Sequence, residues 1–548
     1  MSSEGGDAQG ATIRLVRKSE GPSKPLPATT RERHLVGEPL PDLRQTEVCG
    51  LPAFVVSGTG PVTAGLVFRV GFVDERLPYR GLTHLVEHLT LHRIPTNAGL
   101  AFNGETGLTH TSFYIRGTPG EVAEFFKLVS FSLRVLPMDR VAAEARVLQT
   151  EALKRGPSVV GATSAVRYGA RYAGGLDAEE FVLIDPAPQV QDWSRYWFNA
   201  SNVALWINGD IPPGMDIRLP AGGWHAPPTP PAPAVELPVV VHEGTASVAI
   251  TFPTDRSAAS YILPQVVRDR LMDRLRGEEG RVYDVQADRE LLTADVALVA
   301  IQTSCLPKEA QTVADLAQGV VGELATAGPS AQELETHCAA VSRAMADPAS
   351  ARSRVAGAAA NHLQGRPPLD PPSFLEKLRA VEPDDVACML RHGRQEAVWV
   401  LPKGVSVADH RFMPRQQRPL PELQGRAFAR SRSLDDASAN DALVVAEQGV
   451  CRFSGFGFKR TVLFGYCEAT LVWPNAVALI GYDGFRVTVH RDEWTDGNEA
   501  IGAILARSPA ASIIRVADPL SSAYLEAVAA KSAPGDRREG KRRGLLKG

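Results

Sequence analysis

Cysteine is scarce in this sequence, and the few cysteines lie far apart. The 548 residues contain six cysteines, and no two of them form a C-x-x-C pair. A disulfide framework or a thiolate zinc site needs cysteines at close, paired spacing, so both are disfavoured. We expect reduced and mostly buried thiols at Cys49, Cys305, Cys338, Cys388, Cys451 and Cys467.

Long apolar runs and an excess of charge of one sign are also missing. No uncharged apolar run reaches about 18 residues, and the first 35 residues lack the apolar core of a secretory signal. The 59 basic and 62 acidic residues give a net charge of -3. Because this balance creates no strong overall field, we expect no nucleic-acid and no membrane partner, and a soluble, cytoplasmic protein.

A chain of this length has room for three or four domains. Proline-rich and polar stretches mark the boundaries between them. We expect a flexible leader (1–35), a first repeat (36–218), a Pro-rich linker (219–237), a second repeat (238–405), a second linker (406–440), a small β-rich domain of pleckstrin-homology type (441–512) and a solvated basic tail (513–548).

The two repeats follow from the order of the predicted elements. Strands at 46–56 and 62–70 precede a helix around residue 85, a strand-like stretch at 100–116, helices at 119–136 and 139–155 and a strand at 197–210. The same series recurs in the second half of the chain. It consists of a strand at 247–252, a helix at 258–276, a strand pair at 282–289 and 295–303, helices at 308–327 and 331–346, and a strand at 397–401. We therefore predict an α+β fold of two homologous sandwich-like repeats, each with helices on a mixed or antiparallel sheet, plus a small C-terminal barrel-like domain that ends in a helix at 496–507.

The segment G-L-T-H-L-V-E-H-L, residues 81–89, is the most distinctive stretch of the chain. On a helix its H-x-x-E-H pattern places His84, Glu87 and His88 on one face. The apolar residues of the segment project to the opposite face: Leu82, Leu85, Val86 and Leu89. The segment therefore has an apolar side for packing and a polar side for chemistry.

Two imidazoles one helical turn apart can present nitrogens to one Zn²⁺ ion, and the glutamate beside them can take a proton from a bound water. This is the inverzincin arrangement, the reverse of H-E-x-x-H. A solvated helix face is the alternative interpretation. His92, one turn further on, is a rival ligand or a residue at the rim of the site.

Beyond this motif, the chain resembles the pitrilysin-like zinc peptidases, the family of insulysin and the mitochondrial processing peptidase. The resemblance extends from about residue 48 to residue 404. It rests on V-G-F-V-D-E-R before the H-x-x-E-H motif, N-G-E-T-G-L-T-H-T-S-F-Y after it, then E-A-R-V-L-Q-T-E, and R-L-R-G-E-E-G-R-V-Y in the second repeat. The short interval from His88 to Glu151, and Gly107 where a serine is common, depart from the family pattern.

The resemblance implies roles for residues outside the motif. Glu151 would be the third zinc ligand, and Glu144 would support the site. Arg276 and Tyr283 would bind the substrate backbone and its polarised carbonyl, and Asn103 belongs to the segment that leads into the strand lining the site. Without the resemblance, we would interpret Glu144 and Glu151 as exposed charges on a helix. Arg276 would be a surface arginine and Tyr283 a half-buried tyrosine.

The resemblance therefore implies a zinc-dependent endopeptidase in which Glu87 is the general base and Tyr283 stabilises the oxyanion. Its substrates would be peptides or unfolded precursor segments, cleaved inside a closed chamber. Because one chain carries both the H-x-x-E-H and the Arg/Tyr motif, we expect a homodimer. A catalytically silent, partner-dependent subunit is the main alternative, and a zinc-stabilised scaffold is a weaker one.

Overall fold

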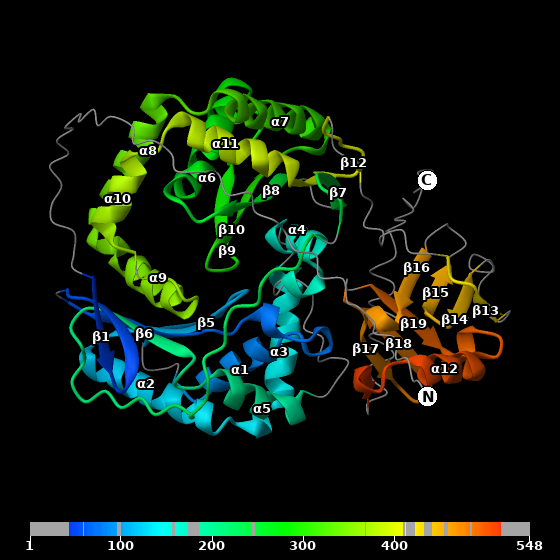
Figure 1. Cartoon of the computed structure of the whole chain (residues 1–548). Coiled ribbons are helices and arrows are strands. Elements are labelled where there is room, and N and C mark those ends of the chain that lie inside the picture. Colours follow the sequence, from blue (N-terminus) through cyan, green and yellow to red (C-terminus); the bar gives the residue numbers. More distant parts are fainter. Residues whose placement is uncertain are drawn as a thin grey trace, which may run out of the picture. The chain divides into compact units, whose positions relative to one another are not determined.

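The computed structural model describes residues 43–516, except for 59, 96–99, 156–158, 174–185, 234, 244–246, 368, 409–410, 413–421, 432–440, 454–458 and 483–484 (Figure 1). The expected leader and nearly all of the expected basic tail lie outside the described residues. The described chain forms two six-stranded sheets, two four-stranded sheets and the helices around them. The predicted α+β class is confirmed.

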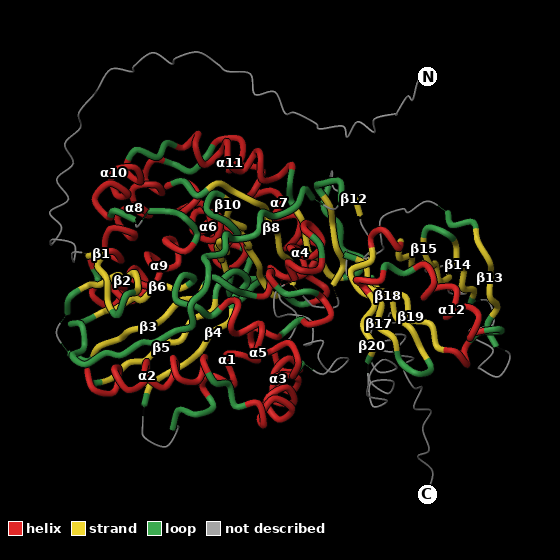
Figure 2. Tube along the Cα trace, turned by 60° about the horizontal axis from the view of Figure 1, so that its bottom comes forward, coloured by secondary structure: helices red, strands yellow, loops and turns green. Residues whose placement is uncertain are grey.

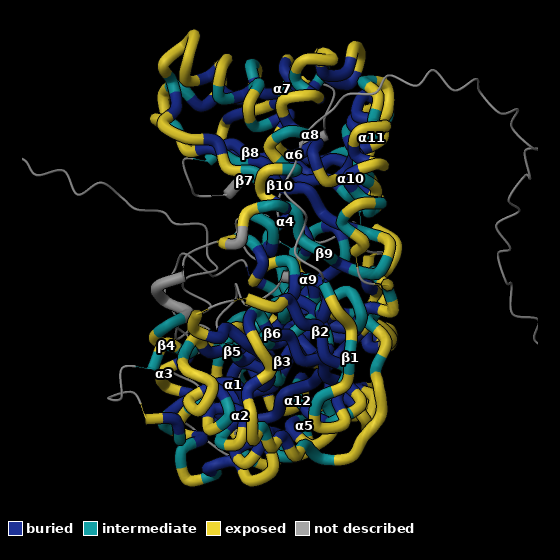
Figure 3. Tube along the Cα trace, turned by 90° about the vertical axis from the view of Figure 1, so that its left-hand side faces the viewer, coloured by how far each residue is buried: buried dark blue, intermediate teal, exposed yellow. Residues whose placement is uncertain are grey.

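The first sheet is buried on both faces at its centre, and Figure 3 shows β2, β3 and β6 in the colour of buried residues. Side chains alternate between the two faces of a strand. Val55 thus faces one core cluster and its neighbour Phe54 another. The strand order is β1 (Leu43–Val48), β2 (Leu51–Val56), β6 (Val203–Asn208), β3 (Val62–Phe68), β5 (Thr111–Gly117) and β4 (Ala101–Thr106).

Helices cover one face of this sheet with a shared apolar core. They are α1 (Leu82–Leu91), α2 (Pro119–Arg134), α3 (Val141–Arg155) and α5 (Ala187–Trp197). Thr118 begins α2 with a capping box, in which its hydroxyl accepts from the Glu121 N–H and Glu121 accepts from the Thr118 N–H. β4 is an edge strand, because it pairs only with β5 among the described strands.

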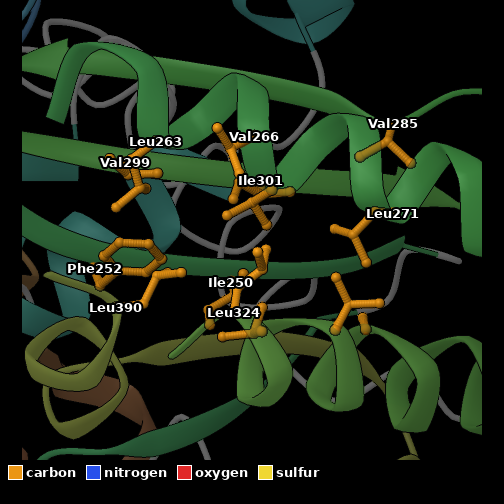
Figure 4. Close-up of a cluster of buried hydrophobic side chains, with 14 of the residues drawn as sticks. Ile250, Phe252, Leu263, Val266, Leu271, Val285, Val299, Ile301, Leu324 and Leu390 are labelled. Atoms are coloured by element: carbon orange, nitrogen blue, oxygen red, sulfur yellow. The ribbon is translucent and has the colours of Figure 1, made fainter. Parts of the chain in front are cut away.

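Five strands of the second sheet follow the same order as in the first sheet, but the edge strand differs. The strands of the second sheet are β12 (Arg411–Phe412), β7 (Val239–Glu243), β11 (Val398–Pro402), β8 (Ser247–Asp255), β10 (Val296–Ser304) and β9 (Gln286–Leu291). β12 comes last in the second repeat and pairs parallel with β7, whereas β1 comes first in its repeat and pairs antiparallel with β2. The helices on its outer face are α6 (Ala258–Leu271), α7 (Ala310–Ala327), α8 (Ala331–Ala346), α10 (Pro371–Arg379) and α11 (Pro383–Gln395). Figure 4 shows their core, in which Phe252 and Ile250 of β8 meet Leu263 and Val266 of α6 and Leu390 of α11.

The two repeats exchange a helix. Helix α9 (Ala351–Leu363) of the second repeat packs on the inner face of the first sheet, where Val355 and Ala359 join the cluster that contains Phe54 and Trp206. Helix α4 (Val159–Tyr168) of the first repeat packs on the second sheet, and Arg167 donates to the Thr251 carbonyl of β8 at 3.3 Å. Figure 2 shows both helices between the two sheets. Each repeat therefore completes the core of the other.

The exchanged helices share a sequence feature that supports their equivalence. Each has two glycines eight residues apart, Gly161 with Gly169 and Gly357 with Gly365. Gly169 and Gly365 follow the helices with φ of +90° and +76°, a left-handed conformation that glycine adopts without strain. The chain thus ends both helices in the same way.

The C-terminal region consists of two four-stranded sheets and a helix. The strand order of the first of these sheets is β13 (Gly425–Ala429), β14 (Ala442–Ala446), β15 (Gly449–Phe453) and β16 (Lys459–Leu463). The strand order of the second is β19 (Arg486–His490), β18 (Ala476–Gly481), β17 (Cys467–Val472) and β20 (Ile513–Arg515). Helix α12 (Gly497–Arg507) shares their core. No closed barrel forms among the described strands. β13 lies inside the segment that we expected to be a linker.

The second C-terminal sheet packs against the segment that leads into α1. Buried Glu468 accepts a hydrogen bond from the Leu77 N–H and another from Arg171, both at 2.9 Å. Arg76 donates to the Glu468 carbonyl at 3.2 Å. The apolar part of this contact is formed by Leu77, Ala170, Ala469, Leu471, Trp473, Ala476, Ala478, Ile480 and Val516.

Several predicted element boundaries needed correction. The expected strand at 197–210 begins only at Val203, because Trp197 ends α5. The expected strand at 282–289 begins at Gln286, and Val282 forms an isolated bridge with Cys305. The expected helix at 258–276 changes into a π-helical turn, Met272–Glu278. Helices α4, α5, α9, α10 and α11 were not predicted.

Two observations concern the absences noted in the sequence. All six cysteines are free, but only Cys451 and Cys467 are buried, three are half-buried and Cys49 is exposed, so the expectation of mostly buried thiols is wrong. No helix in the described part of the chain combines the length and apolarity needed to cross a membrane.

Candidate metal centre and active site

Helix α1 holds the H-x-x-E-H residues in a rigid setting. Leu85, Val86 and Leu89 are fully buried in the core under the first sheet. At the start of the helix the Glu75 carboxylate accepts hydrogen bonds from the Gly81 N–H at 2.6 Å and the Thr83 N–H at 2.7 Å. Burial raises the pKa of Glu75 to about 7. The helix is therefore fixed both along its length and at its first turn.

His84, His88 and Glu151 form a cluster with the geometry of a metal site. Their nearest ligand atoms all lie within 4.8 Å of one another. Glu151 Oε2 is 3.8 Å from His84 Nε2 and 3.5 Å from His88 Nε2. Tetrahedral ligands about 2.1 Å from a zinc ion lie about 3.4 Å apart, so these three side chains fit one ion. Helix α3 brings Glu151 to the cluster from a distant part of the chain.

Glu144 lies two helical turns before Glu151 on α3, and its carboxylate contacts Nδ1 of His88. Its Oε2 lies 3.4 Å from His88 Nδ1, and its Oε1 lies 3.4 Å from His92 Nδ1. A carboxylate at Nδ1 favours the tautomer that leaves Nε2 free to bind a metal. His92 thus faces Glu144, and it is not in the group that could hold a metal ion.

Glu87 is buried between α1 and β4, beside the cluster. Its Oε2 accepts a hydrogen bond from Thr106 Oγ1 at 2.8 Å and lies 3.9 Å from His84 Nε2. Burial raises the pKa of Glu87, although the neighbouring histidines oppose this. A Cβ atom on Gly104 would clash with Glu87 Oε1, so only glycine leaves room for this carboxylate.

Sequence reasoning missed the supporting roles of Gly104 and Thr106. The signal that identifies them is strand alternation, because residues 104 and 106 share the face of β4 that looks toward α1. Asn103 lies on the other face, where its amide donates to the Tyr114 hydroxyl at 3.2 Å. The structure therefore does not bring Asn103 to the histidine and glutamate cluster.

Arg276 and Tyr283 lie together in the second repeat. The Arg276 guanidinium stands 5.3 Å from the centre of the Tyr283 ring, and Tyr283 is 83% exposed. Within the described residues, no hydrogen bond, ion pair or ring contact joins this pair to His84, His88 or Glu151. The pair is free to meet a ligand from solvent.

Comparison with known proteins places this geometry in context. A model of the peptidase M16 inactive domain matches residues 187–341. A protease from Helicobacter pylori is similar in structure, with a TM-score of 0.54 and 15% identity over 66% of this chain and 100% of that chain. A peptidase M16 inactive domain from Pseudomonas fluorescens has a TM-score of 0.55 and 18% identity over 67% of this chain and 99% of that one.

The first half of the periplasmic protease PqqL from Escherichia coli is similar as well, with a TM-score of 0.53 and 15% identity over 67% of this chain and 93% of that chain. This chain shares the fold of these solved structures, one of which is a peptidase M16 inactive domain. No match was found among curated proteins. The residues matched by the M16 inactive domain include Arg276 and Tyr283, whereas His84, Glu87, His88 and Glu151 precede them in the chain.

Proposed function

We propose that this chain is a zinc-dependent endopeptidase that cleaves peptides or unfolded precursor segments. The observation that carries the proposal is the convergence of two imidazole Nε2 atoms and a carboxylate within 4.8 Å, with the separate buried carboxylate of Glu87 beside them. Three ligands of this kind leave a fourth position open, as in catalytic zinc sites. A structural site would fill that position with a further cysteine or histidine.

His84, His88 and Glu151 would hold the ion, and Glu144 would keep His88 in the required tautomer. When bound, zinc supplies Lewis acidity toward a water molecule and the scissile carbonyl. Glu87 is the base placed to take a proton from the attacking water and to return it to the leaving amine nitrogen. Thr106 orients the Glu87 carboxylate through its hydrogen bond.

Two further features are consistent with a peptide substrate. β4 has an open edge among the described strands, so an extended peptide can add to the sheet there by backbone hydrogen bonds. The exposed Tyr283 hydroxyl and the Arg276 guanidinium beside it would bind the substrate backbone and the developing oxyanion. This last role requires that the pair approach the cluster when substrate binds.

The test compares the purified chain with Glu87→Gln and with Glu124→Gln, a matched change at an exposed glutamate of α2. Zinc content is measured by elemental analysis and cleavage with a peptide library. We expect Glu87→Gln to retain zinc and to lose turnover by about 10²-fold or more, while Glu124→Gln behaves as the parent. Equal cleavage by Glu87→Gln and the parent would disprove the assignment.

A catalytically silent subunit is the second candidate, and the match to the M16 inactive domain favours it. This candidate predicts no cleavage by the parent alone, whether or not zinc is bound.

We also propose that the chain acts in the cytoplasm and that it forms a homodimer. The homodimer is proposed because one chain carries both the H-x-x-E-H motif and the Arg/Tyr pair. Light scattering that finds an active monomer would contradict the dimer.

A further inference from the structure

A cavity of about 1640 Å³ lies in the second repeat, away from the His84, His88 and Glu151 cluster. Its wall is made by the start of α6, by α9, α10 and α11, and by the loop before α10. Leu43 and Val56 of the first sheet close it on one side. The cavity is larger than a typical small-molecule site of about 300–1,000 Å³, so it has room for a ligand, and it has no role in the proposed peptidase chemistry.

Arg256 lines this cavity, and its guanidinium forms no ion pair with a carboxylate within the described residues. Its guanidinium donates to the side-chain oxygens of Gln364 and Asn361, at 2.6 and 2.5 Å, and to the Thr293 carbonyl at 2.9 Å. All three acceptors are neutral. Its Nε is buried and has no hydrogen-bond partner among the described residues.

Two more arginines on the wall are in the same condition. Arg289 donates to the hydroxyl of Ser260 at 3.2 Å and stands over the Tyr261 ring, and both of these groups are neutral. The side chain of Arg366 forms no hydrogen bond or ion pair within the described part of the chain. Neither guanidinium therefore forms an ion pair with a carboxylate within the described residues.

The three guanidiniums are close enough to act on one another. The pKa of Arg256 is lowered to about 10, first by burial and then by the positive charges of Arg366 and Arg289, while Asp295 opposes the shift. Burial likewise lowers the pKa of Arg289, with Arg366 contributing. Like charges held together in a partly buried wall are unfavourable unless an anion joins them.

The acidic residues of the wall are engaged elsewhere. The carboxylates of Asp255, Asp370 and Asp385 accept hydrogen bonds from backbone N–H groups at the starts of α6, α10 and α11. Asp295 and Glu396 complete the acidic lining. Within the described residues, none of the five lies within ion-pair distance of Arg256, Arg289 or Arg366. Asp295 and Asp255 act on Arg256 and Arg289 only from a longer distance, so N–H donors of the three arginines remain open to a ligand.

We propose that this cavity binds an oxyanion, a phosphate or carboxylate group, between Arg289 and Arg366, with Arg256 behind them. A guanidinium presents two parallel N–H donors that match such a group. The first residues of α6, Ser257 to Ala259, line the same cavity, and the start of a helix adds partial positive charge. Tyr261 and Phe374 on the wall give an apolar surface for the body of an organic anion.

The test is calorimetric titration of the full chain with three probes. Inorganic tripolyphosphate represents the phosphate source, N-acetylphenylalanine represents the carboxylate source, and N-acetylphenylalanine amide is the neutral control. We expect the parent to bind one or both anions and not the amide, with affinity that falls as salt is raised. Arg366→Ala should weaken binding about 10-fold or more, because a charged hydrogen-bond pair is lost.

Arg116→Ala is the matched control, since Arg116 is an exposed arginine of β5 outside the cavity, and it should bind as the parent does. Arg366→Lys keeps the charge but loses the paired donors, so its affinity should fall between those of Arg366→Ala and the parent. Arg289→Ala repeats the test at a second position if the melting temperature of Arg366→Ala is low. Absence of binding by the parent, or binding as strong as that of the parent by both Arg366→Ala and Arg289→Ala, overturns the proposal.

Discussion

Helices α1 and α6 occupy the same place in their repeats and bury opposite kinds of side chain. Each follows the fourth strand of its sheet in the order of pairing, and each precedes the hairpin that ends at the sheet edge. α1 buries Thr83, His84 and Glu87 in addition to its leucines. α6 buries Leu263 and Val266 at the equivalent contact with the sheet.

The difference shows how one scaffold is divided between chemistry and stability. Buried polar groups cost free energy unless each has a partner, and those of α1 have partners from β4, α3 and the Glu75 carboxylate. α6 needs no such partners. Its π-helical continuation instead carries Arg276 to the surface beside Tyr283. Four predictions test this division.

The largest effect should come from removing the carboxylate that α3 supplies. Glu151→Ala leaves only two ligands, so we expect loss of most of the bound zinc and of activity. Glu144→Gln keeps all three ligands and should reduce zinc affinity by about 10- to 100-fold through His88. Metal titration with a chromophoric chelator measures both. Zinc content in Glu151→Ala equal to that of the parent would rule out this ligand.

Gly104→Ala should separate the base from the metal. The added methyl group would meet the Glu87 carboxylate at less than contact distance, so β4 or Glu87 must shift. We expect activity to fall by about 10-fold or more, since a displacement near 1 Å is costly in an active site, while zinc stays bound. Gly120→Ala, where a Cβ meets nothing within 4 Å, is the control and should be fully active.

A large-to-small change in α6 should affect stability and leave the site intact. Leu263 is fully buried among β8, β10 and α11 (Figure 4). Leu263→Ala should lower the free energy of unfolding by about 2–5 kcal/mol and leave zinc affinity unchanged. Leu306→Ala, at a position that is mostly exposed, should cost far less. Denaturant unfolding monitored by fluorescence gives both values. A loss of zinc in Leu263→Ala would show that the two repeats are not independent in this respect.

The smallest effect concerns pH and Glu75. The folded-state pKa of this carboxyl is about 7, against 4.5 for the exposed group, so the folded chain holds its proton more tightly. Stability should therefore fall as pH rises from about 4.5 through 7, by at most about 3 kcal/mol from this residue. Glu75→Gln should flatten that part of the curve. Some slope will remain from Glu290, whose pKa burial also raises to about 7. If the free energy of unfolding depends on pH in the same way in the parent and in Glu75→Gln, Glu75 does not have the raised pKa.

Much of the fold and part of the candidate site could be predicted because their signals are local. The alternation and periodicity of apolar residues located most strands of both sheets, but β1 with β2 and β4 with β5 were each predicted as one stretch, and β7 and β12 were missed. The H-x-x-E-H spacing identified the polar face of α1. The approach of Glu151 was predicted only through the family resemblance. Its distance from His88 depends on the packing of α3 against α1, which no local pattern encodes.

Features that depend on contacts between distant segments were not predicted. The segment of α4 is rich in valine, serine and threonine, which are weak helix formers, and its helix is stabilised by packing on the second sheet. The requirement for glycine at position 104 arises only because Glu87 packs against β4. The cavity of the second repeat likewise brings together Arg256, Arg289 and Arg366, which are widely separated in the sequence.

The exchange of α4 and α9 has a consequence for how the chain can be divided. A fragment that ended before the second repeat would leave Phe54, Val67 and Trp206 of the first sheet without their cover. A fragment of the second repeat alone would lack the cover that α4 gives to its own sheet. Neither half is therefore a self-sufficient folding unit. Two fragments expressed together should instead associate through these two helices and restore a complete molecule by complementation, in the way that domain-swapped partners do.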